Sequence, residues 1–570
     1  MKGATMSIDL LTQRGEELLS SRETPWSVYP RPQMKRESYI NLNGAWDFSV
    51  NYEKQGQIRV PFCPESSLSA LGKHYEEGSV LQYSRSFTLP EGWNRGRVLL
   101  HIGAADQQAE VFVNGKPVGS HRGGYEAFTL DITHVLQENN LLCICCFDDL
   151  EDQSYPYGKQ VLPKKRGGMW YTPVSGIWQT VWLESVPEHY IQKLHIDNED
   201  YHVHISIEPK LSGKVIVPGV GEYPLINGAC TVVPENPILW SPENPYLYDF
   251  TVETEEDQID SYFAIRTLEV KKIGQYPRLC LNGKPYFFHG LLDQGYWPDG
   301  IFTPAKPECY ADDILAMKKL GFNMLRKHIK VEPEEFYYQC DKLGMIVFQD
   351  MVNNGDYNFL RDTALPTVGI QKMDDRMLHQ DEEVRRKFLK GMKATVNQLK
   401  NHPSICYWTI FNEGWGQFDS NNVYEQFRKL DDTRFIDSTS GWFRREKTDV
   451  DSRHVYFRKV KLRGDGKKPL VLSEFGGKTY KCEDHVFNPD KSYGYGGCDS
   501  LQSLQEAVKK LYMDEVLPCV KQGLCAAVYT QVSDVEDEIN GLLSYDRKVE
   551  KLSPEEMLPV AQALQKAIEA

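Results

Sequence analysis

Two glutamates stand at the ends of strongly apolar runs in the sequence. Glu413 comes directly after SICYWTIFN and precedes Gly-Trp-Gly, and Glu474 comes directly after LVLS and precedes Phe-Gly-Gly. Two carboxyl groups that flank a glycosidic bond can hydrolyse it. At a separation of about 5 Å, one acts as the nucleophile and the other as the general acid and base. Either glutamate alone could instead cap a helix or solvate a loop, so the interpretation depends on their surroundings.

Further polar residues lie at the ends of other apolar runs in the C-terminal half. The candidates for substrate contact are Asp293, Arg326, His328, Asp350, Asn412, His454, Tyr456, Tyr529 and Gln531. If these runs are parallel strands, their carboxyl ends meet at one face and bring the candidates together with the two glutamates. Two alternatives remain open at this point. His328 could be a satisfied core histidine, and Arg326 could be a buried partner of a carboxylate such as Asp350.

The pattern from residue 271 onward predicts the element that positions these groups. Eight strand-like runs, from PYFFHGLL to LCAAVYTQVSD, are interspersed with at least six helical patterns. Repeated strand-then-helix units predict parallel strands joined by right-handed crossovers. Eight such strands in about 300 residues predict a (β/α)8 barrel, whose active site lies at the carboxyl ends of the strands.

The N-terminal half has the pattern of β-structure instead. Short alternating runs punctuated by turn residues predict a β-sandwich over residues 1–187. Within it, Asn114-Gly115 separates AEVFV from KPVGS and predicts a tight hairpin, because both turn positions require positive φ. Residues 188–270 continue in strands without helical periodicity, which fits a small immunoglobulin-like sandwich. The catalytic barrel would then occupy residues 271–570.

Composition excludes several classes of protein. Of the 570 residues, 41% are hydrophobic and 25% are charged, which is typical of a globular chain and excludes general disorder. The net charge of −15 disfavours nucleic acid as a partner. No apolar run approaches the length of a transmembrane helix, and the first residues lack the apolar core of a signal peptide, so we expect no membrane partner and a cytoplasmic location. The 13 cysteines show no metal-ligand spacing, so we expect no metal site.

Several motifs together resemble glycoside hydrolase family 2, the family of β-galactosidases, β-glucuronidases and β-mannosidases. They are INLNGAWDF, NGKPVG, GIWQTVWLE, FFHGLLDQGYWPDG, NMLRKH, WTIFNEGWGQFD and VLSEFGG. The resemblance implies a sugar-binding jelly-roll-like β-sandwich, an immunoglobulin-like β-sandwich and a catalytic (β/α)8 TIM barrel, in that order. It also implies a retaining exo-β-glycosidase that acts on a carbohydrate substrate, needs no cofactor and is compatible with a homo-oligomer.

The resemblance also implies residue roles. Glu413 in FNEGWG would be the general acid and base, and Glu474 in SEFGG would be the nucleophile. Asn412 would bind the sugar 2-hydroxyl. Tyr456 would donate a hydrogen bond to Glu474, and Asp293 would bind hydroxyls at the non-reducing end. The residues expected to line the floor are Arg326, His328 and His454.

The motifs that carry the resemblance do not determine which sugar is preferred. β-Glucuronidases of this family carry an Asn-x-Lys motif after the eighth strand, whereas here Asn540 is followed by Gly-Leu, and three acids occupy 536–538. This favours a β-galactosidase acting on neutral β-galactosides. A β-hexuronidase is the alternative, in which the basic segment 454–468 would bind the sugar carboxylate. A non-catalytic carbohydrate-binding protein is the alternative from another class.

Overall fold

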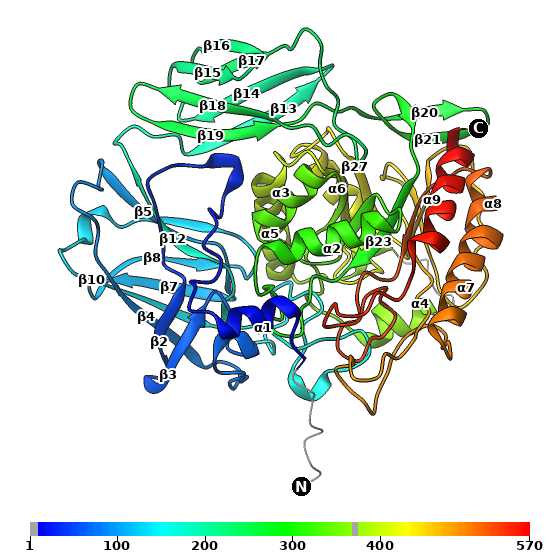
Figure 1. The fold of residues 1–570 in the computed structure, drawn as a ribbon, viewed down its shortest axis with the longest axis horizontal. Helices are drawn as coiled ribbons and strands as arrows, with labels where there is room; N and C mark the ends of the chain where they lie inside the picture. Colours follow the sequence, from blue (N-terminus) through cyan, green and yellow to red (C-terminus); the bar gives the residue numbers. More distant parts are fainter. Residues whose placement is uncertain (1–9, 368–373, 570) are drawn as a thin grey trace.

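The structure is a computed structural model that describes residues 10–367 and 374–569. The chain forms two β-sandwiches that pack beside a C-terminal barrel (Figure 1). In the first sandwich, one sheet has the order β1-β12-β5-β9 (Tyr39–Asn41, Val181–Val186, Arg97–Ile102, Phe128–Asp131). The facing sheet has the order β3-β2-β4-β10-β7-β8 (Glu53–Val60, Gly44–Val50, Val80–Phe87, Asn140–Phe147, Gln108–Val113, Lys116–Arg122). The short strands β6 (Ala105–Asp106) and β11 (Gly176–Ile177) pair beside them.

Alternating side chains explain why these runs form a sandwich. In β10, Leu142, Ile144 and Cys146 are fully buried between the sheets, whereas Leu141 is 48% exposed. Successive side chains of a strand point to opposite faces, so this alternation buries one face of the sheet. The predicted hairpin joins β7 to β8, with φ of 53° at Asn114 and 74° at Gly115.

One N-terminal helix departs from the prediction of β-structure throughout residues 1–187. Helix α1 (Gln13–Ser20) begins after Thr12, whose hydroxyl accepts a hydrogen bond from the amide of Gly15. The same hydroxyl donates to Asp299 of the barrel at 2.6 Å. The sequence therefore contained an N-cap signal, which the surrounding strand-like runs obscured.

The second sandwich has a core of its own. Its sheets have the orders β13-β14-β17 (Lys193–Glu199, His202–Glu208, Ala229–Val232) and β16-β15-β18-β19 (Gly221–Leu225, Gly213–Val217, Tyr248–Thr254, Gln258–Phe263). All of its strand pairs are antiparallel. A hairpin sheet, β20-β21-β22 (Leu268–Ile273, Tyr276–Leu281, Lys284–Pro285), then leads into the barrel, and its turn at 282–285 repeats the NGKP sequence of the first hairpin.

The barrel contains all eight strands that the sequence predicts. They are β23 (Phe288–Asp293), β24 (Met324–Lys327), β25 (Ile346–Asp350), β26 (Ile405–Asn412), β27 (Phe435–Ser440), β28 (Asp451–Val455), β29 (Leu470–Phe475) and β30 (Leu524–Tyr529). Their order is β27-β26-β25-β24-β23-β30-β29-β28, and every pairing is parallel. The sheet thus closes nearly into a ring.

Helices cover the outside of this ring (Figure 1). They are α2 (Glu308–Lys319), α3 (Glu334–Leu343), α4 (Leu365–Thr367), α5 (Glu382–Leu399), α6 (Ser420–Arg428), α7 (Leu501–Leu511), α8 (Leu517–Val520) and α9 (Pro554–Glu569). Irregular segments, not helices, connect β27 to β28 and β28 to β29. No helix among the described residues combines the length and apolarity that a membrane span requires.

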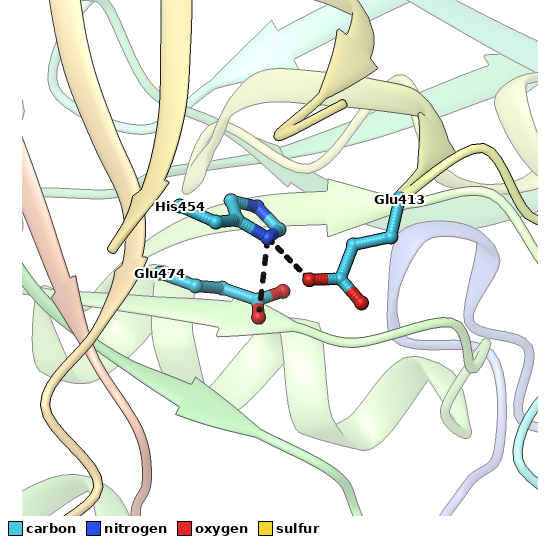
Figure 2. Close-up of side chains that lie close together, drawn as sticks. All are labelled: Glu413, His454 and Glu474. Carbon is cyan, nitrogen blue, oxygen red and sulfur yellow. Dashed lines mark hydrogen bonds and ion pairs between the residues drawn. The ribbon is translucent and has the colours of Figure 1, made fainter. Parts of the chain in front are cut away.

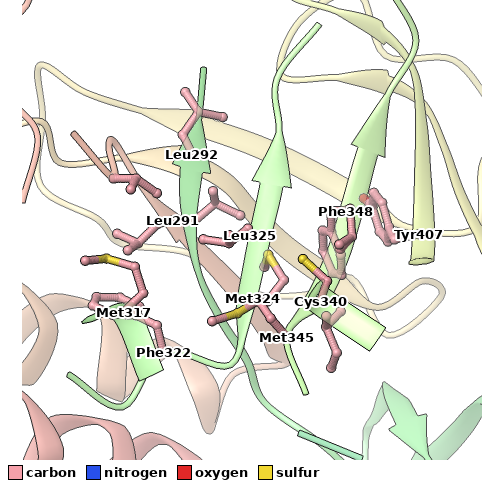
Figure 3. Close-up of a cluster of buried hydrophobic side chains, with 14 of the residues drawn as sticks. Leu291, Leu292, Met317, Phe322, Met324, Leu325, Cys340, Met345, Phe348 and Tyr407 are labelled. Carbon is pink, nitrogen blue, oxygen red and sulfur yellow. The ribbon is translucent and has the colours of Figure 1, made fainter. Parts of the chain in front are cut away.

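The barrel core fixes the strands that carry the polar candidates. Leu291, Met324 and Phe348 of three neighbouring strands pack with Met317 of α2 and Cys340 of α3 (Figure 3). Each of these side chains is at most 1% exposed. Because such a close-packed core has low compressibility, the strand ends hold their polar groups in fixed positions.

Candidate active site

Glu413 and Glu474 converge at the carboxyl ends of their strands (Figure 2). Glu413 follows β26, and Glu474 is the next-to-last residue of β29. Glu413 has a positive φ of 50°, and its backbone amide donates to the carbonyl of Ser440 at 2.9 Å. The side chains of the pair are only 9% and 6% exposed, respectively. A sharp turn after β26 therefore aims Glu413 at Glu474.

His454 of β28 lies between the two carboxylates. Its Nδ1 is 2.8 Å from Glu413 Oε1 and 3.5 Å from Glu474 Oε2, as Figure 2 shows. One ligand atom from each of the three groups lies within 4.8 Å of the others. This separation matches the ~5 Å of a carboxylate pair that acts by double displacement. The same atoms could ligate a cation, but the guanidinium of Arg326, 3.1 Å from Glu474, opposes that use.

Arg326 organises the floor of the site from β24. Its guanidinium donates to Asp350 Oδ1 at 3.0 Å, to Glu474 Oε1 at 3.1 Å and to Asn412 Oδ1 at 2.9 Å. The residue is 1% exposed. Arg326 is thus the buried partner of Asp350 and a direct neighbour of Glu474 at once. Charge-assisted bonds in several directions hold Asn412 and Glu474 in register.

The electrostatic surroundings favour an ionised Glu474. Burial alone would raise the pKa of its carboxyl group, but the neighbouring imidazole of His454 and the guanidinium of Arg326 outweigh burial and lower the pKa to about 2. Tyr456 adds a hydrogen bond, donated from its hydroxyl to Glu474 Oε2 at 2.6 Å, which is the contact that the sequence analysis predicted. Glu474 is therefore an anion throughout the neutral range, as a nucleophile must be.

Asp350 and His328 form a second buried pair beneath the glutamates. His328 Nδ1 lies 2.8 Å from Asp350 Oδ2, and Arg326 engages the other oxygen. Burial lowers the pKa of His328 to about 4, so its ring is neutral at pH 7. With both oxygens engaged, Asp350 positions Arg326 and His328 and does not offer a free oxygen to a sugar.

Several buried polar atoms around the glutamates have no partner among the described residues. They are Asn353 Oδ1 and Nδ2, Asn412 Nδ2, Trp415 Nε1, Gln531 Nε2 and Asn540 Oδ1. Buried polar atoms in folded proteins nearly always have hydrogen-bond partners. These unsatisfied donors and acceptors, at or after the carboxyl ends of β25, β26 and β30, therefore suit a polyhydroxylated ligand, and Asn412 Nδ2 keeps a free donor for the 2-hydroxyl contact that the resemblance implies.

Other predicted contacts are engaged elsewhere. Asp293 accepts from Lys327 Nζ at 2.7 Å and from the amide of Gly295 at 2.9 Å, which leaves it at the edge of the site. The Tyr529 hydroxyl accepts from the amide of Lys478 at 3.0 Å, and its ring is fully buried. Tyr529 therefore supports the loop after Glu474 and does not stack on a sugar. Gln531 keeps one free donor, because only its Oε1 is occupied, by Gln294.

Sequence reasoning missed a cation that the first sandwich contributes to this site. Lys159 lies in the segment that joins β10 to β11, residues 148–175, which we call the bridging segment. Its Nζ is 5.3 Å from the ring centroid of Trp415 and 5.7 Å from that of Tyr171. The residue is 7% exposed, and no hydrogen bond or ion pair of Nζ occurs among the described residues. Nothing in its local sequence distinguishes it from a surface lysine.

Contacts across the domains determine where Lys159 lies. The amide of Gly158 donates to the carbonyl of Asn353 at 2.9 Å, and Asn354 Nδ2 donates to the carbonyl of Gly158 at 2.7 Å. Tyr171 donates its hydroxyl to Glu538 Oε2, in the segment after β30. The lysine charge opposes the rise that burial causes in the pKa of Glu538. Lys159 is thus held between the loops that follow β25, β26 and β30.

The basic segment after His454 has a different position. Arg458, Lys459 and Lys461 line a groove on the outer side of Tyr456, together with residues of α7. Within the described chain, none of the three forms an ion pair with Glu413 or Glu474. The groove includes Tyr456 and Gly476 but neither of these two glutamates, so the hypothesis that this segment binds the carboxylate of the sugar stays a prediction.

Three family models match consecutive parts of the chain. The model described as "Glycosyl hydrolases family 2, sugar binding domain" matches residues 70–187, "Glycosyl hydrolases family 2" matches 187–266, and "Glycosyl hydrolases family 2, TIM barrel domain" matches 272–483. Together these matches cover more than half of the chain, in the order of its three cores.

Curated relatives are similar over most of this chain. A β-galactosidase of Thermoanaerobacter pseudethanolicus is 24% identical over 80% of this chain and 63% of its own length. A β-glucuronidase of Felis catus is 26% identical over 68% of this chain and 65% of its own length. The chain thus spans somewhat less than two thirds of these relatives.

Solved structures share the complete fold. A β-D-glucuronidase of Dictyoglomus thermophilum superposes with a TM-score of 0.70 at 20% identity, over 94% of this chain and 98% of the other. A family 2 β-galacturonidase of Eisenbergiella tayi, bound to galacturonate, has a TM-score of 0.68 at 19% identity, over 95% and 99%.

Proposed function

We propose that this chain, which belongs to glycoside hydrolase family 2, removes terminal β-linked sugars by double displacement with retention of configuration. The observation that carries the proposal is the pair Glu413 and Glu474, whose atoms lie within 4.8 Å of each other and of His454. Among the described residues, Glu474 forms an ion pair with a permanent cation, Arg326, and Glu413 does not, so the two carboxyl groups lie in different electrostatic environments. Such a difference suits an anionic nucleophile and a proton-exchanging partner.

The mechanism follows from these positions. The Glu474 carboxylate attacks the anomeric carbon, while Glu413 protonates the departing glycosidic oxygen, and a covalent glycosyl–enzyme forms. Glu413 then takes a proton from water, which attacks the same carbon and releases both the sugar and Glu474. Arg326 holds Glu474 and Asn412 in register, and Asn412 Nδ2 is free to bind the 2-hydroxyl, a contact that strengthens in the transition state.

Substitution of the two glutamates tests the roles. We expect Glu413→Ala and Glu474→Ala each to lower kcat on an aryl β-glycoside by about 10²–10⁴-fold or more. Azide should restore turnover in both, because it fits where the carboxylate was removed. The glycosyl azide should have β configuration with Glu413→Ala and α configuration with Glu474→Ala. The reverse assignment of anomers would exchange the two roles, and full activity of either variant would refute the mechanism.

For the glycone we favour a β-hexuronide, with Lys159 as the group that binds its carboxylate. The support is that Lys159 is only 7% exposed, has no ion pair among the described residues and lies over the ring of Trp415, which follows Glu413 by two residues. The chain also lacks the lysine of the Asn-x-Lys motif after Asn540. Several similar proteins are β-glucuronidases or a β-galacturonidase by name. A buried ammonium without a counter-ion suits an anionic ligand.

A β-galactoside is the second candidate, and one observation favours it. Glu538 and Asn540 are hydrogen-bonded to each other at 3.0 Å beside Lys159, and their carboxylate and amide oxygens suit sugar hydroxyls. One similar protein is a β-galactosidase by name. If Lys159 binds a hydroxyl in place of a carboxylate, the galactoside is the substrate.

Lys159→Met separates the two candidates. On 4-nitrophenyl glucuronide and galacturonide, we expect the substitution to lower kcat/KM by about 10–150-fold, the value of one charge-assisted hydrogen bond. Activity on the galactoside should fall less. Lys165→Met, an exposed lysine of the same bridging segment, is the matched control and should change neither. Wild-type turnover of galactoside alone, with a loss of that activity in Lys159→Met, would select the second candidate.

A further inference from the structure

A groove rich in unpaired cations begins at the outer side of Tyr456. It has a volume of about 1010 Å³ and lies between the segment after β28 and the helices α7 and α8. Its cationic lining comprises Arg458, Lys459, Lys461, Lys478 and Lys510, which we call the basic groove. None of these five side chains forms an ion pair among the described residues. The chain as a whole is acidic, with a net charge of −15, so the excess of positive charge in this groove is local.

The acids of the groove do not neutralise it. Glu515 accepts a hydrogen bond from the backbone amide of Val460 at 2.7 Å, so it holds the basic segment in place. Asp514 is the other carboxylate in the lining. Five cations thus face two acids, of which one is already engaged.

The groove adjoins the candidate active site through Tyr456, whose neighbour in the site is Glu474. Tyr456 lines the groove, and its hydroxyl donates to Glu474 at 2.6 Å. The ring of Tyr456 stacks on Tyr495 at a centroid separation of 4.1 Å, and Tyr495 also lines the groove. The stacked pair forms the boundary between the two spaces, and Phe457, 80% exposed, stands at the rim. A leaving group on a sugar at Glu474 therefore needs only to pass the edge of this stacked pair to reach the basic groove.

We propose that the basic groove binds the leaving group of the substrate, and that this leaving group is an acidic oligosaccharide that bears carboxylates or sulfates. This inference rests on the proposed function. The proposed function concerns the sugar that is cleaved off, whereas this inference concerns the group to which that sugar is attached. Exposed arginines and lysines without counter-ions attract a polyanion over several ångströms, and the attraction weakens with salt. The aromatic rim formed by Phe457 and Tyr495 suits the faces of sugar rings.

Charge removal tests the proposal. The test variant is Arg458→Gln/Lys459→Gln/Lys461→Gln. The control is Lys116→Gln/Lys210→Gln/Lys429→Gln, which removes three exposed cations without ion pairs among the described residues, one each from the first sandwich, the second sandwich and the end of α6. The probe is fluorescently labelled trigalacturonate, titrated by anisotropy against each triple variant made in the Glu474→Gln background. At low salt, we expect the groove variant to have a Kd about tenfold higher than the protein with the unchanged groove, and the control to have a Kd within about twofold of it. The difference should vanish near 1 M NaCl.

Kinetics connects the groove to catalysis. Unlabelled trigalacturonate should competitively inhibit hydrolysis of a 4-nitrophenyl β-glycoside, with an inhibition constant raised about tenfold in the groove variant and with unchanged kcat/KM for the aryl substrate itself. Equal binding by the two triple variants, non-competitive inhibition, or tighter binding of an oligothymidylate of equal charge would overturn the proposal. Absence of turnover on every glycoside would refute the proposed function separately, because the anisotropy titration does not require turnover.

Discussion

At the scale of single residues, the two carboxylates of the site have unequal surroundings. The guanidinium of Arg326 and the hydroxyl of Tyr456 contact opposite oxygens of Glu474, at 3.1 Å and 2.6 Å. Together with the nearby imidazole of His454, which has the largest lowering effect, these contacts keep the pKa of Glu474 at about 2, below its ordinary value of 4.5. A group with a lowered pKa stabilises the folded state above its unfolded pKa and loses that contribution as the pH falls. Glu474 therefore contributes stability above pH 4.5, which is lost between pH 4.5 and 2.

Tyr456→Phe isolates the hydroxyl contact. Without that donor the pKa of Glu474 should rise, so the acid limb of kcat/KM should move to higher pH, and kcat at neutral pH should fall by about tenfold for one lost hydrogen bond to a charged group. The measurement is a pH–rate profile on an aryl β-glycoside. Tyr493→Phe is the control, since Tyr493 contacts Tyr495 at 3.4 Å and does not touch Glu474. An acid limb that stays in place would show that Tyr456 does not govern Glu474.

At the scale of elements, periodicity and short motifs in the sequence predicted the barrel strands and the tight hairpin. The eight apolar runs all became barrel strands, and the predicted Asn114-Gly115 turn adopted positive φ, because alternation and turn chemistry are local properties. The polar residues after β26 and within β28 and β29 met at one site, since parallel strands present their carboxyl ends to one face. Placement of Glu413 and Glu474 followed from topology alone.

Side-chain contacts between segments that are far apart in the sequence could not be predicted from periodicity and motifs. Whether Asp350 meets a sugar depends on Arg326 and His328, which occupy both of its oxygens. Lys159 lies in an irregular segment of another domain, where no periodic pattern relates it to the barrel. The basic segment after His454 was recognisable as basic, but its direction depends on Tyr456 and Glu515. Such tertiary partners have no signature in one sequence.

At the scale of the whole molecule, buried polar contacts bind the three cores together. Arg36, which precedes β1, donates to Glu184 of the first sandwich at 3.0 Å and to Asp257 of the second at 2.7 Å. Tyr262 of the second sandwich donates to Asp341 of the barrel at 2.7 Å. These contacts are buried, so removal of one partner leaves a group without its hydrogen bond and costs about 1–3 kcal/mol or more. These contacts fix the barrel relative to the two sandwiches, and the bridging segment packs against the barrel in that position.

Gly158→Ala tests whether that docking sets the geometry of the site. Gly158 has a φ of 68°, and a Cβ there would lie 2.9 Å from the carbonyl oxygen of Ile329, so the segment must move away from the barrel. We expect kcat/KM to fall about tenfold or more, because a displacement near 1 Å moves Lys159 from the glycone. Gly115→Ala is the matched control: its φ is 74° and a Cβ would meet nothing within 4 Å. Both variants carry the backbone cost of alanine at positive φ, which lowers the free energy of unfolding, measured by urea titration, by about 1 kcal/mol. If both also lost activity equally, backbone strain and not the position of Lys159 would explain the loss; if neither did, the bridging segment would have no part in binding the sugar.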